Sequence, residues 1–281
     1  MFKKIFLTAL AVSCTLYTPS FAGDSLDGLR QRLSAPDPAV RLDAVRRLSV
    51  DYHGQVLDAL IAATDDSDEY VRERAVQALG TTGNQQALTA VRNSLDDPAD
   101  FVRWRGVQAC QRLGLRQVSG QFANLINDPF WRVRLVTFQL LGEIGKELMV
   151  SGSSELASSP IGKKIRDLLI SGLSDPDERS RVAAARALAA NRDKAAFGPL
   201  VTLMDEASLF TREQAALGLG ELGDRSALEP LIAALEDPKN TACSEGRDWA
   251  CWGAAVALQK LTGQDYKTNA AKWRQWLAAN K

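Results

Sequence analysis

The sequence has a single histidine, four cysteines and no excess of either charge among its 281 residues. Without a second histidine the common His-rich zinc sites are excluded, and Ser-His-Asp or Cys-His catalysis would have to use His53. That residue stands in a predicted turn and has no nucleophile evidently paired with it, so we expect a surface or helix-capping role. The 34 basic and 34 acidic residues balance, which argues against nucleic acid as a partner. No metal, cofactor or catalytic residue is predicted.

Two further absences narrow the class of protein. No segment is a convincing β-strand, so no Gly-rich phosphate loop follows one. After the N-terminal segment no apolar run is long enough to cross a bilayer. Acidic pairs are present, such as Asp65 with Asp66 and Asp96 with Asp97. They recur at one repeated position, which predicts helix capping rather than calcium binding.

Residues 1–22 have the pattern of a secretory signal peptide. A basic pair precedes an apolar run over residues 5–17, and Ala22 ends a short segment with small residues. This pattern predicts cleavage after Ala22 and a periplasmic or secreted mature protein. The alternative is a lipoprotein anchored through Cys14, but the three residues before that cysteine lack the usual leucine.

What the chain does have is a repeat marked by arginine. Four of the five gaps between successive register arginines are 31 residues, and the fifth is 47, one repeat length plus 16. A period of this length predicts an α-solenoid built from helical hairpins. The register arginines are Arg41, Arg72, Arg103, Arg134, Arg181 and Arg212.

Positions around each arginine repeat as well. Six residues before it stands an acidic residue in five of the six units, usually followed by proline, as in Asp97 and Pro98. We read this as an acidic turn with proline at the first helical position. Apolar or small residues recur at offsets −1, +3, +4 and +7, which is one face of an α-helix. A shorter apolar helix is predicted before each acidic turn, and glycines follow the second helices.

A seventh unit is less regular. Asp237 and Pro238 form its acidic turn, and we place Trp252 in the arginine position, which implies an insertion of nine residues. The other interruption is the extra 16 residues around 145–162, rich in Ser and Gly. It fits a binding loop or a flexible elbow equally well.

The D-P-x-x-x-V-R and A-V-x-x-L spacing resembles HEAT-like repeats, particularly the short type first associated with phycobilisome lyases, over about residues 25–263. The closing stretch from Leu261 to Tyr266, with Trp273 and Trp276 after it, looks like the C-terminal cap of many secreted bacterial HEAT-repeat proteins. The resemblance implies an all-α superhelix of about seven hairpins with a C-terminal capping helix. The predicted organisation is signal peptide 1–22, repeats 1–4 over 23–144, insertion 145–162, repeats 5–7 over 163–264 and cap 265–281.

The resemblance also implies a role for the six arginines, because the matching residue in such repeats commonly pairs with turn carboxylates of its own and adjacent repeats. We therefore expect a structural ladder. Partner contact is expected on the other face of the second helices, which usually line the concave surface of a solenoid. The predicted partner-binding residues are Arg46, Arg74, Gln77, Trp104, Arg105, Gln108, Arg112, Gln139 and Arg186.

The predicted export would place the cysteines in an oxidising compartment, which decides how they are interpreted. Cys110 takes a core position and is predicted to be a small buried hydrophobe. Cys243 and Cys251 both lie in the seventh-unit insertion, between Pro238 and Trp252, and are predicted to form a disulfide. Free thiols, or a redox or metal role, are the alternatives.

Taken together, these patterns predict a non-catalytic, protein-binding scaffold or assembly factor of the bacterial cell envelope that binds a partner through the concave face and the inserted loops. HEAT solenoids are mostly scaffolds and only occasionally assist enzymes. A chaperone-lyase subunit similar to phycobilin lyases is one alternative, and a thiol-redox protein using Cys243 and Cys251 is another. The expected partner is another protein, not nucleic acid, and a small-molecule ligand is not expected.

Overall fold

A computed structural model describes residues 25–51, 56–115, 120–150, 159–206, 208–237 and 249–280. Within these ranges every regular element is a helix. The predicted signal peptide 1–22, Cys14, His53 and Cys243 lie outside the described residues.

Successive α-helices pair into seven hairpins, followed by one terminal helix. The first helices of the hairpins are α1 (Leu26–Arg32), α3 (Leu57–Ala62), α5 (Leu88–Asn93), α7 (Gln121–Leu125), α9 (Pro160–Gly172), α11 (Phe197–Leu203) and α13 (Leu228–Glu236). The second helices are α2 (Pro38–Asp51), α4 (Glu69–Thr82), α6 (Asp100–Arg112), α8 (Trp131–Val150), α10 (Glu178–Ala190), α12 (Leu209–Leu222) and α14 (Trp249–Thr262). The terminal helix is α15 (Ala270–Ala279), and short 3₁₀ turns join several of the elements.

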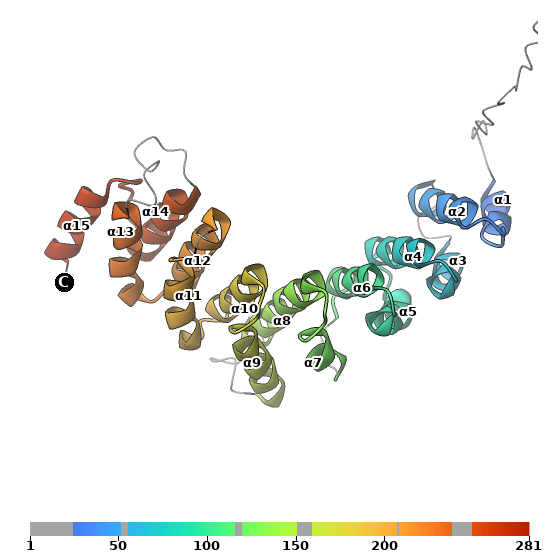
Figure 1. The fold of residues 1–281 in the computed structure, drawn as a ribbon, viewed down its shortest axis with the longest axis horizontal. Coiled ribbons are helices and arrows are strands. Elements are labelled where there is room, and N and C mark those ends of the chain that lie inside the picture. Colours follow the sequence, from blue (N-terminus) through green and yellow to red (C-terminus); the bar gives the residue numbers. More distant parts are fainter. Residues whose placement is uncertain are drawn as a thin grey trace, which may run out of the picture.

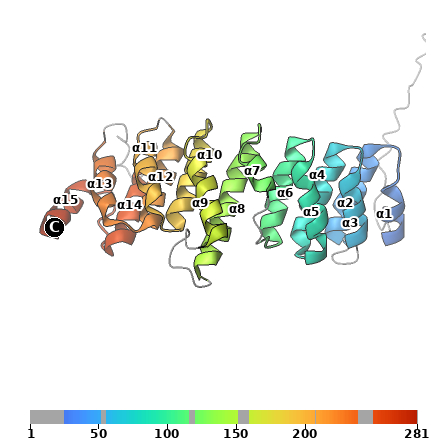
Figure 2. The same cartoon turned by 90° about the horizontal axis from the view of Figure 1, so that it is seen from below.

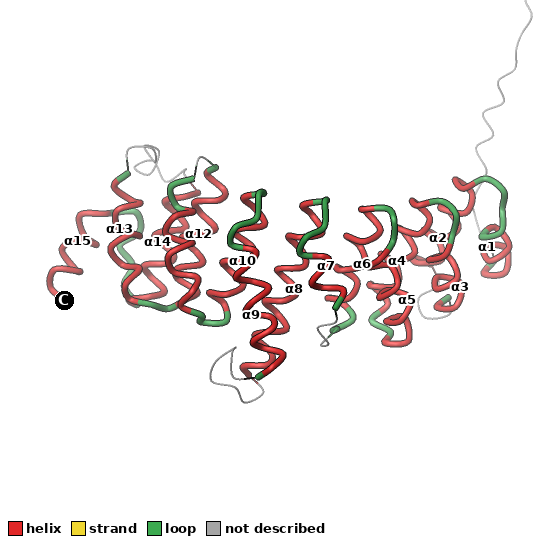
Figure 3. The backbone as a smooth tube through the Cα atoms, turned by 60° about the horizontal axis from the view of Figure 1, so that its bottom comes forward, coloured by secondary structure: helices red, strands yellow, loops and turns green. Residues whose placement is uncertain are grey.

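The hairpins stack along one axis into a curved solenoid, as the fold prediction states. Figure 1 shows the second helices from α2 to α12 along the inner edge of the arc and the first helices along its outer edge. Seen from below, the hairpins form a single row that ends at α15 (Figure 2). In the tube view the connecting turns lie along the two sides of this row (Figure 3).

The predicted apolar face of the second helices is the buried one. In α4, the residues at offsets −1, +3, +4 and +7 from Arg72 are Val71, Ala75, Val76 and Leu79, all fully buried. The same offsets are buried in α6, α8, α10 and α12. One hydrophobic cluster runs without a break from Leu29 to Trp273. A solenoid buries its core between neighbouring repeats in this way, so stability depends on each repeat contacting the next.

The prolines do not occupy the first helical position that the sequence pattern suggested. α6 begins at Asp100 and α10 at Glu178, so Pro98 and Pro176 precede the helices. The N-cap of α10 is Asp177, whose carboxylate accepts from the N–H groups of Arg179 and Ser180. Asp68 caps α4 in the same way. In α4 and α10 the capping carboxylate is therefore four residues before the register arginine, not six.

The glycines after the second helices divide into two kinds. Gly83, Gly114 and Gly223 have positive φ and end their helices, as predicted. Gly80 and Gly142 instead lie inside α4 and α8. A Cβ at Gly142 would stand 2.6 Å from Ala187 Cβ, and one at Gly80 would stand 2.7 Å from Ala109 Cβ. These two glycines allow consecutive second helices to approach closely.

The same close contact corrects the register of the seventh repeat. Gly220, eight residues after Arg212, faces Ala257. Where Gly80 faces Ala109 and Gly142 faces Ala187, the alanine stands six residues after its register arginine. By this equivalence the arginine position on α14 is occupied by Cys251, not Trp252. The insertion is eight residues rather than nine.

The 16-residue insertion is partly helical. Residues 145–150 continue α8, which has 20 residues, and α9 already begins at Pro160. Residues 151–158 lie outside the described ranges. Part of the extra sequence therefore lengthens the two helices that meet there, in place of the Ser/Gly-rich loop predicted over 145–162.

The C-terminal helix closes the core. Trp273 on α15 is fully buried, contacts Tyr266 edge-to-face at 4.9 Å, and donates from Nε1 to the Lys267 carbonyl at 2.9 Å. Arg274 fixes α15 to α13 through Glu229 and through Glu236, the latter at 2.7 and 3.0 Å. The last repeat thus has its apolar end covered, as a terminal solenoid unit requires.

Candidate partner-binding surface

The register arginines clamp the turns together. Each uses one guanidinium nitrogen to bond the carbonyl six residues earlier in its own repeat, at 2.8–2.9 Å. In the first four, Nε and the other nitrogen donate to both oxygens of the next repeat's aspartate, with Nε–Oδ2 distances of 2.6–2.8 Å. The pairs are Arg41–Asp66, Arg72–Asp97, Arg103–Asp128 and Arg134–Asp175, and Arg181 bonds Glu206 at 2.8 Å.

The ladder aspartates are held on both sides. Asp66 Oδ1 accepts from Arg41 at 2.7 Å and from the backbone N–H of Asp68 at 2.8 Å. Burial opposes ionisation of this carboxyl, but the hydrogen bonds from Arg41 and Asp68 together outweigh it and lower the pKa of Asp66. The hydrogen bond to Asp66 in turn raises the pKa of Arg41. The register arginines are thus bonded within the stack. Partner contact is therefore sought on the concave stripe, the row of residues on the second helices that faces the inside of the arc.

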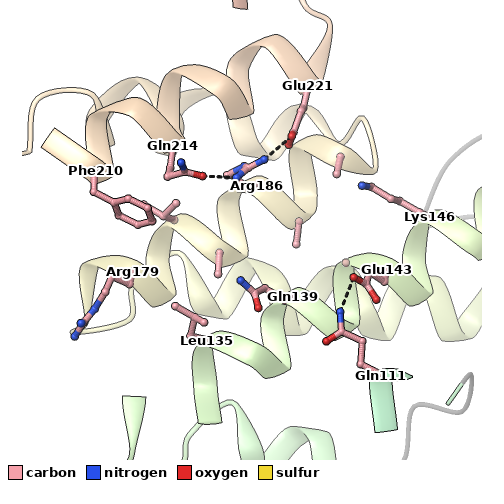
Figure 4. Close-up of a pocket in the computed structure, with 15 residues that line it drawn as sticks. Gln111, Leu135, Gln139, Glu143, Lys146, Arg179, Arg186, Phe210, Gln214 and Glu221 are labelled. Atoms are coloured by element: carbon pink, nitrogen blue, oxygen red, sulfur yellow. Dashed lines mark hydrogen bonds and ion pairs between the residues drawn. The ribbon is translucent and has the colours of Figure 1, made fainter. Parts of the chain in front are cut away.

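On that stripe, four consecutive second helices form a depression of about 320 Å³. Its lining residues come from α6, α8, α10 and α12 and include Gln139, Lys146, Arg186 and Phe210. In Figure 4, Arg186 lies between Gln214 and Glu221 of the next helix and bonds both, the latter at 2.5 Å. Gln111 donates to Glu143 at 2.6 Å, so neighbouring repeats are also joined along the surface itself. Phe210 is 54% exposed, which leaves an aromatic ring available beside these polar groups.

A second hollow, of about 370 Å³, lies nearer the N-terminus and is rich in aromatic side chains. Tyr70, Phe101 and Trp104 line it together with Arg105 and Arg132. Tyr70 and Phe101 are 62% and 48% exposed. The guanidinium carbon of Arg105 lies 4.3 Å from the Trp104 ring centroid, and that of Arg132 lies 5.5 Å from it. Aromatic and arginine side chains of this kind carry much of the energy in protein interfaces.

The structure brings some of the predicted partner-binding residues together and leaves others apart. Gln139 and Arg186 share the first hollow, and Trp104 and Arg105 share the second. The others make local contacts or are open to solvent. Arg74 donates to Gln77 at 2.8 Å, Gln108 accepts from Arg105 at 3.1 Å, Arg46 lies 3.7 Å from Asp43, and Arg112 is exposed.

Sequence reasoning missed the position two residues before each register arginine. In repeats 2 to 6 it is occupied by Tyr70, Phe101, Arg132, Arg179 and Phe210. All five line one of the two hollows. This offset lies one helical turn before offset +2, on the same stripe, so extending the stripe by a turn toward the helix start would have found it.

Cys110 is fully buried, and burial raises the pKa of its thiol to about 12. It therefore behaves as the small core residue that was predicted. Cys251 is buried on α14. Its predicted bond partner, Cys243, is not among the described residues, so the disulfide stays a prediction.

Among the described residues, no group of three or more His, Cys, Asp or Glu side chains is placed to hold a metal ion. Nor does any helix in the described ranges combine the length and apolarity needed to cross a membrane.

Comparison with known proteins agrees with this geometry. A family model for HEAT repeats matches residues 26–111 and 166–250, more than half of the chain. The chain belongs to the HEAT-repeat family. No curated protein matches it.

Several solved structures are similar to the chain. The complex of CpcE and CpcF of phycocyanin lyase from Nostoc sp. PCC7120 matches with a TM-score of 0.51 and 21% identity, over 87% of this chain and 97% of that one. A designed armadillo repeat protein matches at 0.40 and 20%, over 85% and 100%. Human deoxyhypusine hydroxylase in complex with glycerol matches at 0.38 and 16%, over 86% of each chain. At 21% identity the likeness to the phycocyanin lyase complex shows the fold alone.

Proposed function

We propose that this HEAT-repeat protein is a non-catalytic scaffold or assembly factor that binds a protein partner along its concave face. The observation that carries the proposal is the hollow formed by α6, α8, α10 and α12, whose lining combines exposed Phe210 at one end with Gln139, Lys146 and Arg186. An aromatic anchor surrounded by polar groups is the usual composition of a protein-binding hot spot. Because the hollow draws on four repeats, a partner bound there contacts a surface that no single repeat provides.

The rigidity of this surface supports the proposal. Arg186 joins α10 to α12, and Gln111 joins α6 to α8, through bonds that lie on the face itself. A preorganised surface loses less conformational entropy on binding than a mobile one. The fold thus presents fixed side chains, as a scaffold should.

The cellular site is part of the proposal and comes from the sequence. The signal-peptide pattern of residues 1–22 supports export to the bacterial envelope. Fractionation with N-terminal sequencing tests it, since the expected mature chain begins at Gly23 in the periplasm or the medium. A chain found in the cytoplasm that still begins at Met1 would refute this part.

Partner capture tests the binding surface. A photo-crosslinker is placed at Gln139 in cells, and covalent products are identified by mass spectrometry. Replacing Phe210 with Ala and Lys146 with Glu should lower the yield of the captured partner about tenfold. The matched control is Ile161→Ala on α9, which changes an apolar residue of similar exposure, 47%, on the outer row of helices. Equal yields from the Phe210/Lys146 variant and from wild type would contradict the proposal.

A further inference from the structure

Two places along the solenoid have the same arrangement of an acidic residue and a tryptophan on adjacent second helices. With Cys251 at the register position of α14, Trp252 stands at offset +1, as Trp104 does on α6. The second helix before each tryptophan has a glutamate at offset +1, Glu73 on α4 and Glu213 on α12. Offset +1 faces the concave side, since Leu135 and Val182 at this offset line the first hollow.

At the first of these places the arrangement holds a guanidinium. Arg105, which follows Trp104, donates from Nε to Glu73 at 2.5 Å. Its guanidinium carbon lies 4.3 Å from the centre of the Trp104 ring. The carboxylate and the indole thus contact the same cation, one by an ion pair and one through its π-face.

At the second place the described residues supply no such cation. The residue after Trp252 is Gly253, so no side chain stands where Arg105 stands on α6. Glu213 is only 8% exposed, yet no hydrogen bond or ion pair to its carboxylate is found within the described part of the chain. The Glu213 carboxylate oxygens do not belong to the buried side-chain atoms that lack a partner, so this carboxylate reaches solvent and is open to a cation from outside the described residues.

The chain cannot supply the cation from this position. A Cβ at Gly253 would lie 2.9 Å from the Glu213 carbonyl oxygen and 3.0 Å from Glu213 Cγ. The close packing of α14 on α12 therefore excludes a side chain there. Two aromatic side chains remain accessible to a partner, because Trp252 on α14 and Phe210 on α12 are each 54% exposed.

We propose that Glu213 and Trp252 form a recognition site for an arginine side chain of the partner protein. The guanidinium would take the place that Arg105 takes at the first site, bonded to the carboxylate and stacked on the indole. Arginine fits better than lysine because its planar group can stack and donate at once, whereas an ammonium is a compact point charge. This inference rests on the proposed function, that the concave face binds a protein.

Titration of the full-length chain with N-acetyl-arginine amide tests the site, with the neutral isostere N-acetyl-citrulline amide as the control probe. The indole N–H signal of Trp252 in the ¹⁵N spectrum, assigned with Trp252→Phe, reports binding. The arginine probe should shift this signal and bind at least tenfold more tightly than the citrulline and lysine analogues. Glu213→Gln should remove that preference, and Asp167→Asn, which changes an exposed carboxylate on α9, should keep it.

Equal binding of arginine and citrulline, or unchanged arginine binding in Glu213→Gln, would overturn the site. Equal binding of arginine and lysine would overturn the assignment to arginine. If Glu213→Gln does not fold, Trp252→Leu replaces it, with binding read from saturation transfer to the probe and an expected loss of about fivefold.

The outcomes separate this inference from the proposed function. If the probe fails while the Phe210/Lys146 variant still loses its partner, the arginine site is wrong and the scaffold function stands. If the probe binds at Glu213 while partner capture is unaffected by the Phe210/Lys146 variant, the site stands and the proposed function falls.

Discussion

Arg134 and Asp175 are 41 residues apart in the chain, yet they form the same bidentate ion pair that Arg72 and Asp97 form across 25 residues. The Nε–Oδ2 distances are 2.7 and 2.8 Å. The 16 additional residues between repeats 4 and 5 therefore leave the ladder unbroken. Asn191 of α10 also donates to the Gly142 carbonyl of α8 at 3.1 Å. These bonds across the junction argue against a flexible elbow there, one of the two interpretations left open by the sequence.

The first prediction concerns this ion pair. Asp175→Asn should destabilise the protein by about 2–3 kcal/mol, because it leaves the buried Arg134 guanidinium without its charged partner. The Arg134 and Asp175 side chains are only 10% and 4% exposed. Urea unfolding measures the effect. Asp27→Ala, which breaks the exposed 3.6 Å pair with Arg30, is the control and should change stability by less than about 0.5 kcal/mol. Similar losses in both variants would show that the ladder has no special role.

The second prediction concerns pH. The pKa of Asp66 lies below its usual value of 3.8, so this carboxylate stabilises the fold above that pH. The contribution is lost as the pH falls from about 3.8 through the lowered folded-state pKa, because the folded chain then binds the proton less readily than the unfolded chain. Melting temperatures measured between pH 2 and pH 7 should fall in this acidic window. Asp66→Asn should be less stable at pH 7 and should lose less on acidification. A parallel pH profile for the two proteins would contradict this assignment.

The third prediction concerns close helix packing. Gly142→Ala should destabilise by about 1–3 kcal/mol, because the added methyl would lie 2.6 Å from Ala187 Cβ and 3.1 Å from its Cα. This steric cost should exceed the roughly 1 kcal/mol that alanine gains over glycine in helix propensity. The control is Gly198→Ala in α11, where nothing lies within 4 Å of the new Cβ. That variant should be neutral or up to about 1 kcal/mol more stable, and thermal unfolding compares the two. A stabilised Gly142→Ala variant would disprove the close contact.

The fourth prediction concerns the thiols. Cys110 should not react with a thiol reagent at pH 8 in the folded protein, since it is fully buried and burial raises its pKa to about 12. Its labelling rate should follow the opening of the third repeat. After unfolding without reductant, the mature chain should show one reactive thiol if Cys243 and Cys251 are bonded. Three reactive thiols in that assay would rule out the disulfide.

The candidate surface could be predicted only in part. Offsets +2 and +5 correctly place Gln139 and Arg186 on the concave stripe. They could not show that Arg186 is bonded to Gln214 and Glu221. Nor could they show that Arg105 forms an ion pair with Glu73. Those contacts join different repeats and depend on how far successive helices are rotated and shifted. A single-helix pattern does not contain that information.

Local sequence determined the repeat, the buried face of each second helix and the left-handed helix ends at Gly83, Gly114 and Gly223, because spacing along one helix decides them. Only the tertiary structure decided which carboxylate pairs with which arginine, that Gly142 is a contact point, and that Cys251 takes the register position of α14. These relationships depend on the distance between helices, which is set by the packing of every side chain between them. For the same reason, only the stacked repeats show Glu213 buried on α12 without the arginine that Glu73 has.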